Sequence, residues 1–193
     1  MSAGRQPTTD LALIAVFAAL IAAFSVVPGL PVGPVPITLQ TLAVILSGLV
    51  LGPWRGFAAT ALYLLVGFAG LPVFAGGAAG LGVLAKPSIG YLLSFPFAAL
   101  LAGVFAQRLA GPNRRARFLW LFLSGFGASV LVIHPAGILG LMLVAHMSLN
   151  AAIATDLIFW PGDVVKNLVA AAIAVAVHKA FPALLATRTP VAA

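Results

Sequence analysis

Apolar stretches of helical length follow one another along almost the whole chain, and proline and glycine separate them. Hydrophobic residues make up 63% of the sequence and charged residues only 7%, whereas a soluble domain carries about 25% charged residues. A chain with so few polar groups is unsuited to a water-exposed fold. We therefore expect an all-α integral membrane protein.

Six transmembrane helices are predicted, because a spanning helix needs about 20 apolar residues and at least about 17. They form a compact bundle and a single domain over residues 1–193. The second and third runs are short, and the fifth is expected to kink or break at Pro135. Glycine-rich residues 70–88 are predicted to form an irregular outer loop between the third and fourth helices. The predicted helices cover residues 11–27, 37–51, 57–69, 89–109, 118–144 and 161–185.

Basic residues indicate how the bundle is oriented. If six helices alternate, only Lys86 and Lys166 of the ten Lys and Arg residues fall on the side opposite the termini. The positive-inside rule then places both termini in the cytoplasm and residues 70–88 outside. The net charge of +7 is therefore interpreted as loop topology and not as affinity for nucleic acid. We expect a multi-pass protein of the cytoplasmic membrane, in contact with lipid and without a nucleic-acid partner. The remaining basic residues are Arg5, Arg55, Arg108, Arg114, Arg115, Arg117, Lys179 and Arg188.

Asp163 and Lys166 are opposite charges at the start of the last apolar run. Three residues apart on a helix, they share one face. Buried charges in a membrane segment are costly and usually functional, so we interpret the pair as a small-molecule site. The carboxylate suits N–H donors, and the ammonium suits an anionic group. The alternative is a helix cap that Lys166 neutralises. Asn167 extends the same face, either toward a ligand or toward another helix.

Three further side chains at the outer face are candidates for the same site. Gln40, near the start of the second helix, can donate and accept hydrogen bonds, or it makes a polar contact between helices. Phe74, in the glycine-rich loop, suits an apolar pocket wall. Tyr91 is either a pocket wall or an anchor at the membrane interface.

Several classes of chemistry lack support in the sequence. There is no cysteine, and the three histidines do not have metal-ligand spacing, so neither a metal site nor a cofactor is expected. No catalytic constellation is present, and the glycine-rich loop lacks the Gly-Lys-Ser/Thr ending of a phosphate-binding loop. We therefore expect a non-enzymatic protein, and any ATPase that drives it must be another chain.

Four motifs in order resemble the BioY family, the biotin-binding S components of energy-coupling-factor (ECF) vitamin transporters. The resemblance covers about residues 9–182 and implies a six-helix bundle that binds biotin from the outer side. It implies a transmembrane T component and a pair of cytoplasmic ATPases as partners, although some members are reported to act without them. Asp163 would then accept from the ureido N–H groups, and Lys166 would bind either the carboxylate or the ureido oxygen. The motifs are PVPITLQTL from residue 34, GLPVFAGG from 70, PSIGYL from 87 and PGDVVK from 161.

Departures from the family pattern occur at the outer face. Lys86 adds a cation, Ile89 replaces a glycine, and Ala78 stands where the loop often has a polar residue, which removes one expected ligand contact. The alternatives are an S component for another small vitamin and a solitary or secondary vitamin transporter. The sequence is also compatible with a homo-oligomer.

Small residues repeat every fourth position on the first helix, at Ala15, Ala19 and Ala23. Such a stripe permits close approach of another helix. It predicts either a docking face for the T component or packing within the bundle.

Overall fold

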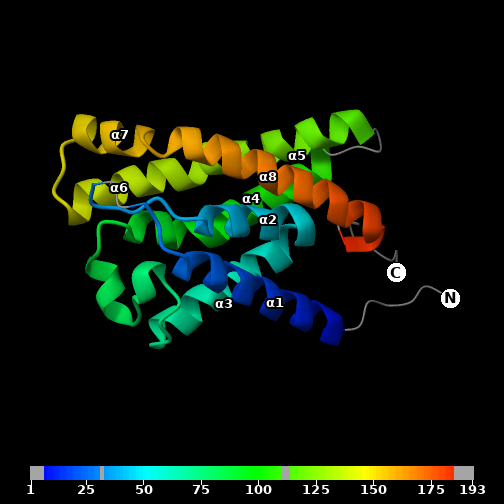
Figure 1. Cartoon of the computed structure of the whole chain (residues 1–193), viewed down its shortest axis with the longest axis horizontal. Helices are drawn as coiled ribbons and strands as arrows, with labels where there is room; N and C mark the ends of the chain where they lie inside the picture. Colours follow the sequence, from blue (N-terminus) through cyan, green and yellow to red (C-terminus); the bar gives the residue numbers. More distant parts are fainter. Residues whose placement is uncertain (1–6, 31–32, 110–113, 185–193) are drawn as a thin grey trace, which may run out of the picture.

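The structure is a computed structural model that describes residues 7–30, 33–109 and 114–184. This part of the chain is helical and contains only isolated β-bridges, such as Leu30 to Ile37, in place of strands. Figure 1 shows the helices packed side by side along one long axis. The α-helices are α1 (Pro7–Val26), α2 (Gln40–Leu51), α3 (Pro53–Phe68), α4 (Ile89–Leu109), α5 (Arg114–Ala128), α6 (His134–Val144), α7 (Leu149–Leu157) and α8 (Trp160–Ala180). Short 3₁₀ turns are η1 (Ala75–Gly77), η2 (Leu81–Ala85) and η4 (Pro182–Leu184), and η3 (Ser129–Ile133) is a π-helical turn.

The predicted all-helical bundle is confirmed. Among the described residues, four runs are long and apolar enough to cross a membrane: α1, α4, the run from α5 to α6, and α8. Helices α2 and α3 correspond to the two short predicted runs, with 12 and 16 residues. Every residue of α2 except Thr41 is buried, so the other helices surround α2 and it does not need the full length of a lipid-facing span.

Several predicted helix boundaries were wrong by a few residues. Helix α1 begins at Pro7 and α3 at Pro53, because proline at a first turn gives up no helical hydrogen bond. Helix α2 begins only at Gln40, since the backbone of Ile37 exchanges two 2.9 Å hydrogen bonds with Leu30. Helix α8 ends at Ala180, and residue 185, the predicted end, lies outside the described residues.

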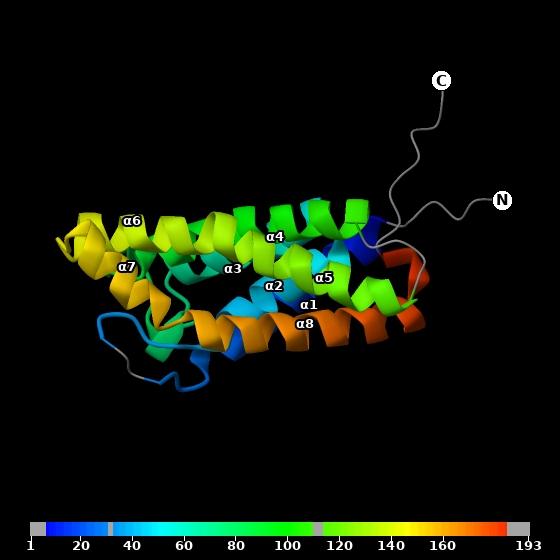
Figure 2. The same cartoon turned by 90° about the horizontal axis from the view of Figure 1, so that it is seen from above.

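Of the two alternatives predicted at Pro135, a kink or a break, the break does not occur. The chain stays helical from α5 through η3 into α6, and Figure 2 shows a continuous helix that changes direction near η3. The irregularity is the π-helical turn just before Pro135, which lies in the first turn of α6. Proline and π-helical turns are both recognised causes of a change in helix direction.

Helix α7 was missed by the sequence analysis, which left residues 146–160 without a helix. It has nine residues, and the Ser148 side chain accepts a hydrogen bond from the Ala151 backbone at its first turn. The helix is too short to register as a span. It returns beside α6 and brings Asp156 into the bundle, where this side chain is buried.

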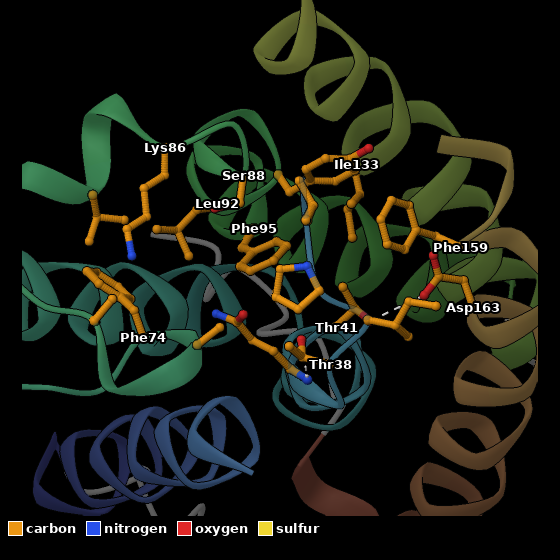
Figure 3. Close-up of a pocket in the computed structure, with 18 of the residues that line it drawn as sticks. Thr38, Thr41, Phe74, Lys86, Ser88, Leu92, Phe95, Ile133, Phe159 and Asp163 are labelled. Carbon is orange, nitrogen blue, oxygen red and sulfur yellow. Dashed lines mark hydrogen bonds between the residues drawn. The ribbon is translucent and has the colours of Figure 1, made fainter. Parts of the chain in front are cut away.

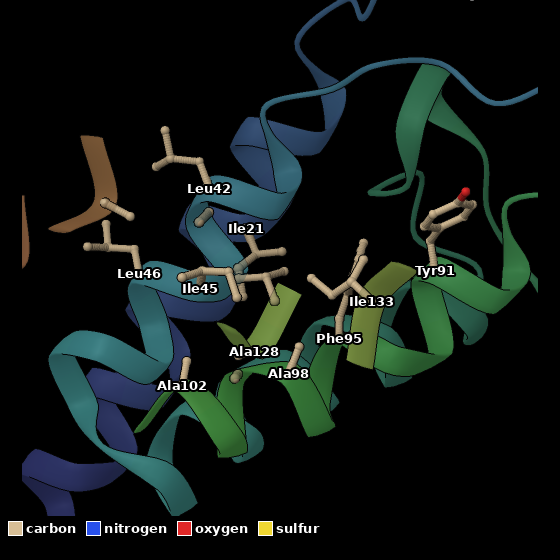
Figure 4. Close-up of a cluster of buried hydrophobic side chains, with 14 of the residues drawn as sticks. Ile21, Leu42, Ile45, Leu46, Tyr91, Phe95, Ala98, Ala102, Ala128 and Ile133 are labelled. Carbon is tan, nitrogen blue, oxygen red and sulfur yellow. The ribbon is translucent and has the colours of Figure 1, made fainter. Parts of the chain in front are cut away.

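Helix α4 is the central element and packs against α2, α3, α5 and α6. Glycine permits two of these approaches. A Cβ on Gly48 would lie 2.2 Å from the Ala99 carbonyl oxygen, and one on Gly90 would lie 2.0 Å from that of Ala136. Side chains of α1, α2, α4 and the α5–α6 run fill the space between the helices (Figure 4).

The start of α1 and the end of α8 lie at the same end of the bundle in Figure 1 and in Figure 2. At this end Arg55 of α3 connects α1 to η4. Its guanidinium lies 3.4 Å from Asp10 and donates to the Leu184 carbonyl. Arg108 closes α4 at this end, whereas Lys86 precedes α4 at the other. Arg5 and Arg188, which the orientation argument also uses, lie outside the described residues.

Candidate ligand-binding site

One cavity opens between α2, α4, α8 and the glycine-rich loop (Figure 3). The space among its side chains, together with the open solvent at its mouth, is about 720 Å³. Its wall is largely apolar. The lining residues are Val35, Pro36, Ile37, Thr38, Gln40, Thr41, Phe74, Ala75, Ala78, Val83, Lys86, Ser88, Tyr91, Leu92, Phe95, Ile133, Phe159, Asp163 and Lys166.

Asp163 and Lys166 form a buried ion pair on one side of the cavity. Lys166 Nζ lies 2.9 Å from Asp163 Oδ1 and 3.0 Å from Thr41 Oγ1. Thr41 in turn donates to the same Asp163 oxygen at 3.3 Å. Asp163 Oδ2 therefore stays clear of this triangle. Of the three ammonium protons of Lys166, two are used by Asp163 and Thr41, and one is left for a ligand.

Gln40 and Phe74 also line the cavity, but on the side of α3. The Gln40 side-chain nitrogen donates to the Tyr63 hydroxyl at 2.7 Å, which fixes the amide. Phe74 packs edge-on against Tyr63, with ring centroids 5.4 Å apart. Its ring lies so close to α3 that a Cβ on Gly67 would stand 2.2 Å away. The loop segment that carries Phe74 is thus held against the bundle.

Tyr91 lines the cavity with its ring, whereas its hydroxyl is directed into the protein and donates to Asp156 at 2.8 Å. The ring lies over Gly137, where a Cβ would come within 2.0 Å of it. We therefore assign Tyr91 to the pocket wall, one of the two alternatives for this residue.

Asn167 is the one predicted ligand residue that does not line the cavity. It is buried, and its amide nitrogen lies 2.8 Å from the Asp163 carbonyl and 3.3 Å from Ser129 Oγ. The amide oxygen faces Gly125 of α5. This placement matches the contact between helices that was the alternative for this residue.

Three polar residues near the site escaped the sequence analysis. Thr41 follows Gln40 directly, and its place in the PVPITLQTL motif was the only sequence signal for it. Asp156 and His134 lie in segments treated as irregular or unremarkable. His134 Nδ1 lies 2.9 Å from Asp156, and Nε2 lies 3.7 Å from Asp163 Oδ2.

Lys86 lies on the side of the cavity opposite Asp163 (Figure 3) and is exposed at the rim. The cavity therefore has the hydrogen-bonded Asp163 and Lys166 on one side and the ammonium group of Lys86 on the other. Apolar side chains such as Phe95 line the space between them. No cluster of metal-ligating side chains is present in the part of the chain that the structure describes. The arrangement suits binding of an elongated, mainly apolar molecule with polar ends.

The model of the BioY family matches residues 1–183. The chain belongs to the BioY family. A biotin transporter BioY of Rhizobium etli is 38% identical over 92% of this chain and 97% of its own length. Another, from Rhodobacter capsulatus, is 39% identical over 93% of this chain and 98% of its own length.

A solved structure agrees with this family membership. The S-component for biotin from an ECF-type ABC transporter superposes with a TM-score of 0.81 at 28% identity, covering 91% of this chain and 95% of its own. The resemblance inferred from the four sequence motifs is confirmed. The apolar spans and the family together make this a multi-pass membrane protein.

Proposed function

We propose that this chain captures biotin at the outer face of the cytoplasmic membrane and transfers it inward as the substrate-binding subunit of an ECF transporter. The buried Asp163–Lys166 pair in an otherwise apolar cavity carries the proposal. Charges of this kind are retained in a membrane segment where a ligand uses them. The names of the relatives and of the solved structure support biotin as that ligand.

The two sides of the cavity suggest how biotin would lie. Its ureido group has two N–H donors and one oxygen acceptor, which complement the Asp163 carboxylate and the remaining Lys166 proton. Its fused ring would contact apolar side chains such as Phe74 and Phe95. Its carboxylate tail would then extend toward Lys86. This orientation assigns Lys166 to the ureido oxygen, one of the two alternatives that the sequence left open.

The partner module is proposed on separate grounds. No nucleotide-binding motif occurs in the sequence, so an ATP-driven cycle would need separate ATPases and a T component. Ala15, Ala19 and Ala23 are all exposed on α1, whereas Ala18 and Ile21 face the bundle. This exposure supports the docking interpretation of the stripe over packing within the bundle.

Calorimetry on the purified protein in detergent tests the proposal. We expect biotin to bind, and thiamine and riboflavin to give no binding heat. Asp163→Asn and Lys166→Met should each weaken biotin binding about tenfold or more, because an unpaired buried group costs about 1–3 kcal/mol.

The matched control is Asp10→Asn, which changes a carboxylate at the opposite end of the bundle. It should leave biotin affinity unchanged. Absence of biotin binding by the native protein would overturn the proposed function. Native-like binding by both site variants would show that biotin binds elsewhere in the protein.

A further inference from the structure

Two of the three acidic residues of the chain, Asp156 and Asp163, are buried in the same region of the bundle. Asp156 does not line the cavity, and only 2% of its surface is exposed. A buried carboxylate in a membrane protein is costly unless hydrogen bonds and opposite charges compensate it. The partners of Asp156 therefore indicate what this carboxylate does.

Asp156 accepts from side chains of three other elements. The Tyr91 hydroxyl of α4 lies 2.8 Å from Oδ1, and Trp160 Nε1 of α8 lies 3.0 Å from Oδ2. His134 Nδ1 of α6 lies 2.9 Å from Oδ2. Because an ionised carboxylate only accepts hydrogen bonds, this geometry assigns a proton to His134 Nδ1. Asp156 thus fixes the orientation of the imidazole.

The opposite ring nitrogen points at the ligand site. His134 Nε2 is buried, has no hydrogen-bond partner among the described residues, and lies 3.7 Å from Asp163 Oδ2. The other Asp163 oxygen already binds Lys166 and Thr41. The imidazole also stacks on Trp160, with ring centroids 5.0 Å apart, so two contacts hold the ring in this direction.

We propose that His134, oriented by Asp156, is a positioning residue for the ligand-binding carboxylate of Asp163. The inference rests on the proposed function. In the ligand-bound protein His134 carries protons on both ring nitrogens, and Nε2–H donates to Asp163 Oδ2. The two carboxylates are then balanced by two cations, His134 and Lys166. Asp163 is then held at both oxygens, so the remaining lone pair of Oδ2 meets a ligand N–H group in a fixed direction.

A purely structural role, in which His134 only joins α6 to α7 through Asp156, predicts a different mutational pattern. In His134→Asn the amide nitrogen takes the place of Nδ1 and keeps the bond to Asp156. In His134→Gln it takes the place of Nε2 and can reach Asp163. Positioning predicts that biotin affinity falls by about threefold or less in the Gln variant and by about tenfold or more in the Asn variant. The structural role predicts the reverse order.

Thermal unfolding of each variant without biotin reports folding separately from affinity. A native-like affinity of His134→Asn, or a greater loss in His134→Gln, would overturn the inference. Should either variant not fold, a structure of the biotin-loaded native protein decides: Nε2 within about 3.2 Å of Asp163 Oδ2 supports positioning, and an unpaired Nε2 contradicts it. Native protein without biotin affinity would instead count against the proposed function.

Discussion

Lys86 places an exposed ammonium group at the rim of the cavity, across from Asp163. If the biotin carboxylate lies there, Lys86→Met should weaken binding of biotin but leave binding of neutral biotinamide unchanged. We expect a loss of up to about fivefold, since an exposed ion pair contributes about 0.2–1 kcal/mol. Calorimetric titration of both ligands at low salt measures this difference. An equal loss for the two ligands would place the carboxylate elsewhere.

Single residues differed in how far the sequence could predict them. Asp163 and Lys166 stood out because charges are rare in this chain and because a spacing of three residues places them on one helix face. Asp156 and His134 are separated by 22 residues, and only the return of α7 beside α6 brings them together. No local pattern encodes that contact. Asn167 shared the predicted face, but its rotation about α8 turns it toward α5.

At the scale of the elements, α4 depends on glycine where it crosses α6. A methyl group at Gly90 would collide with the backbone carbonyl of Ala136, and no side-chain rotation can relieve that clash. Gly90→Ala should therefore lower the free energy of unfolding by about 1–3 kcal/mol. Gly162→Ala is the matched control, because its Cβ would meet nothing within 4 Å. Thermal unfolding in detergent compares them, and equal stabilities would contradict the packing.

Helix α1 offers the second prediction at this scale. Because Ala19 is exposed, Ala19→Trp should leave folding and biotin binding intact yet block docking of a T component that approaches α1 closely. Leu123→Trp on α5, at a site 41% exposed, controls for an added surface tryptophan. Co-purification with the T component measures docking. Native yield with Ala19→Trp would place the docking face elsewhere, and loss of biotin binding would favour packing within the bundle.

The sequence indicated the long apolar helices well and the short or irregular ones poorly. Hydropathy finds a span by its length, so α7, with nine residues, gave no such signal. Pro135 suggested a kink or a break because proline removes a hydrogen bond, but the chain continues through the π turn of η3, and α4 packs along both α5 and α6. The irregular loop was predicted correctly in kind, with two short 3₁₀ turns in place of a regular helix.

At the scale of the whole molecule, most of the described basic residues lie at one end of the bundle and the cavity lies at the other. Arg55, Arg108 and Lys179 lie at the end where α1 begins, and Lys86 lies at the end where the glycine-rich loop covers the cavity. The positive-inside rule predicts that the first end lies in the cytoplasm. The cavity would then face the outside, as capture of an external solute requires.

Labelling of single cysteines tests this orientation, and the natural chain has none to interfere. Cysteine at Ala79, in the loop at the cavity end, should react in intact cells with a membrane-impermeant maleimide. Cysteine at Asn113, between α4 and α5, should react only after the membrane is permeabilised, because six alternating spans place that linker with the termini. Labelling of Asn113→Cys but not Ala79→Cys in intact cells would invert the topology, and the proposed site would then open toward the cytoplasm, where it could release biotin but not capture it.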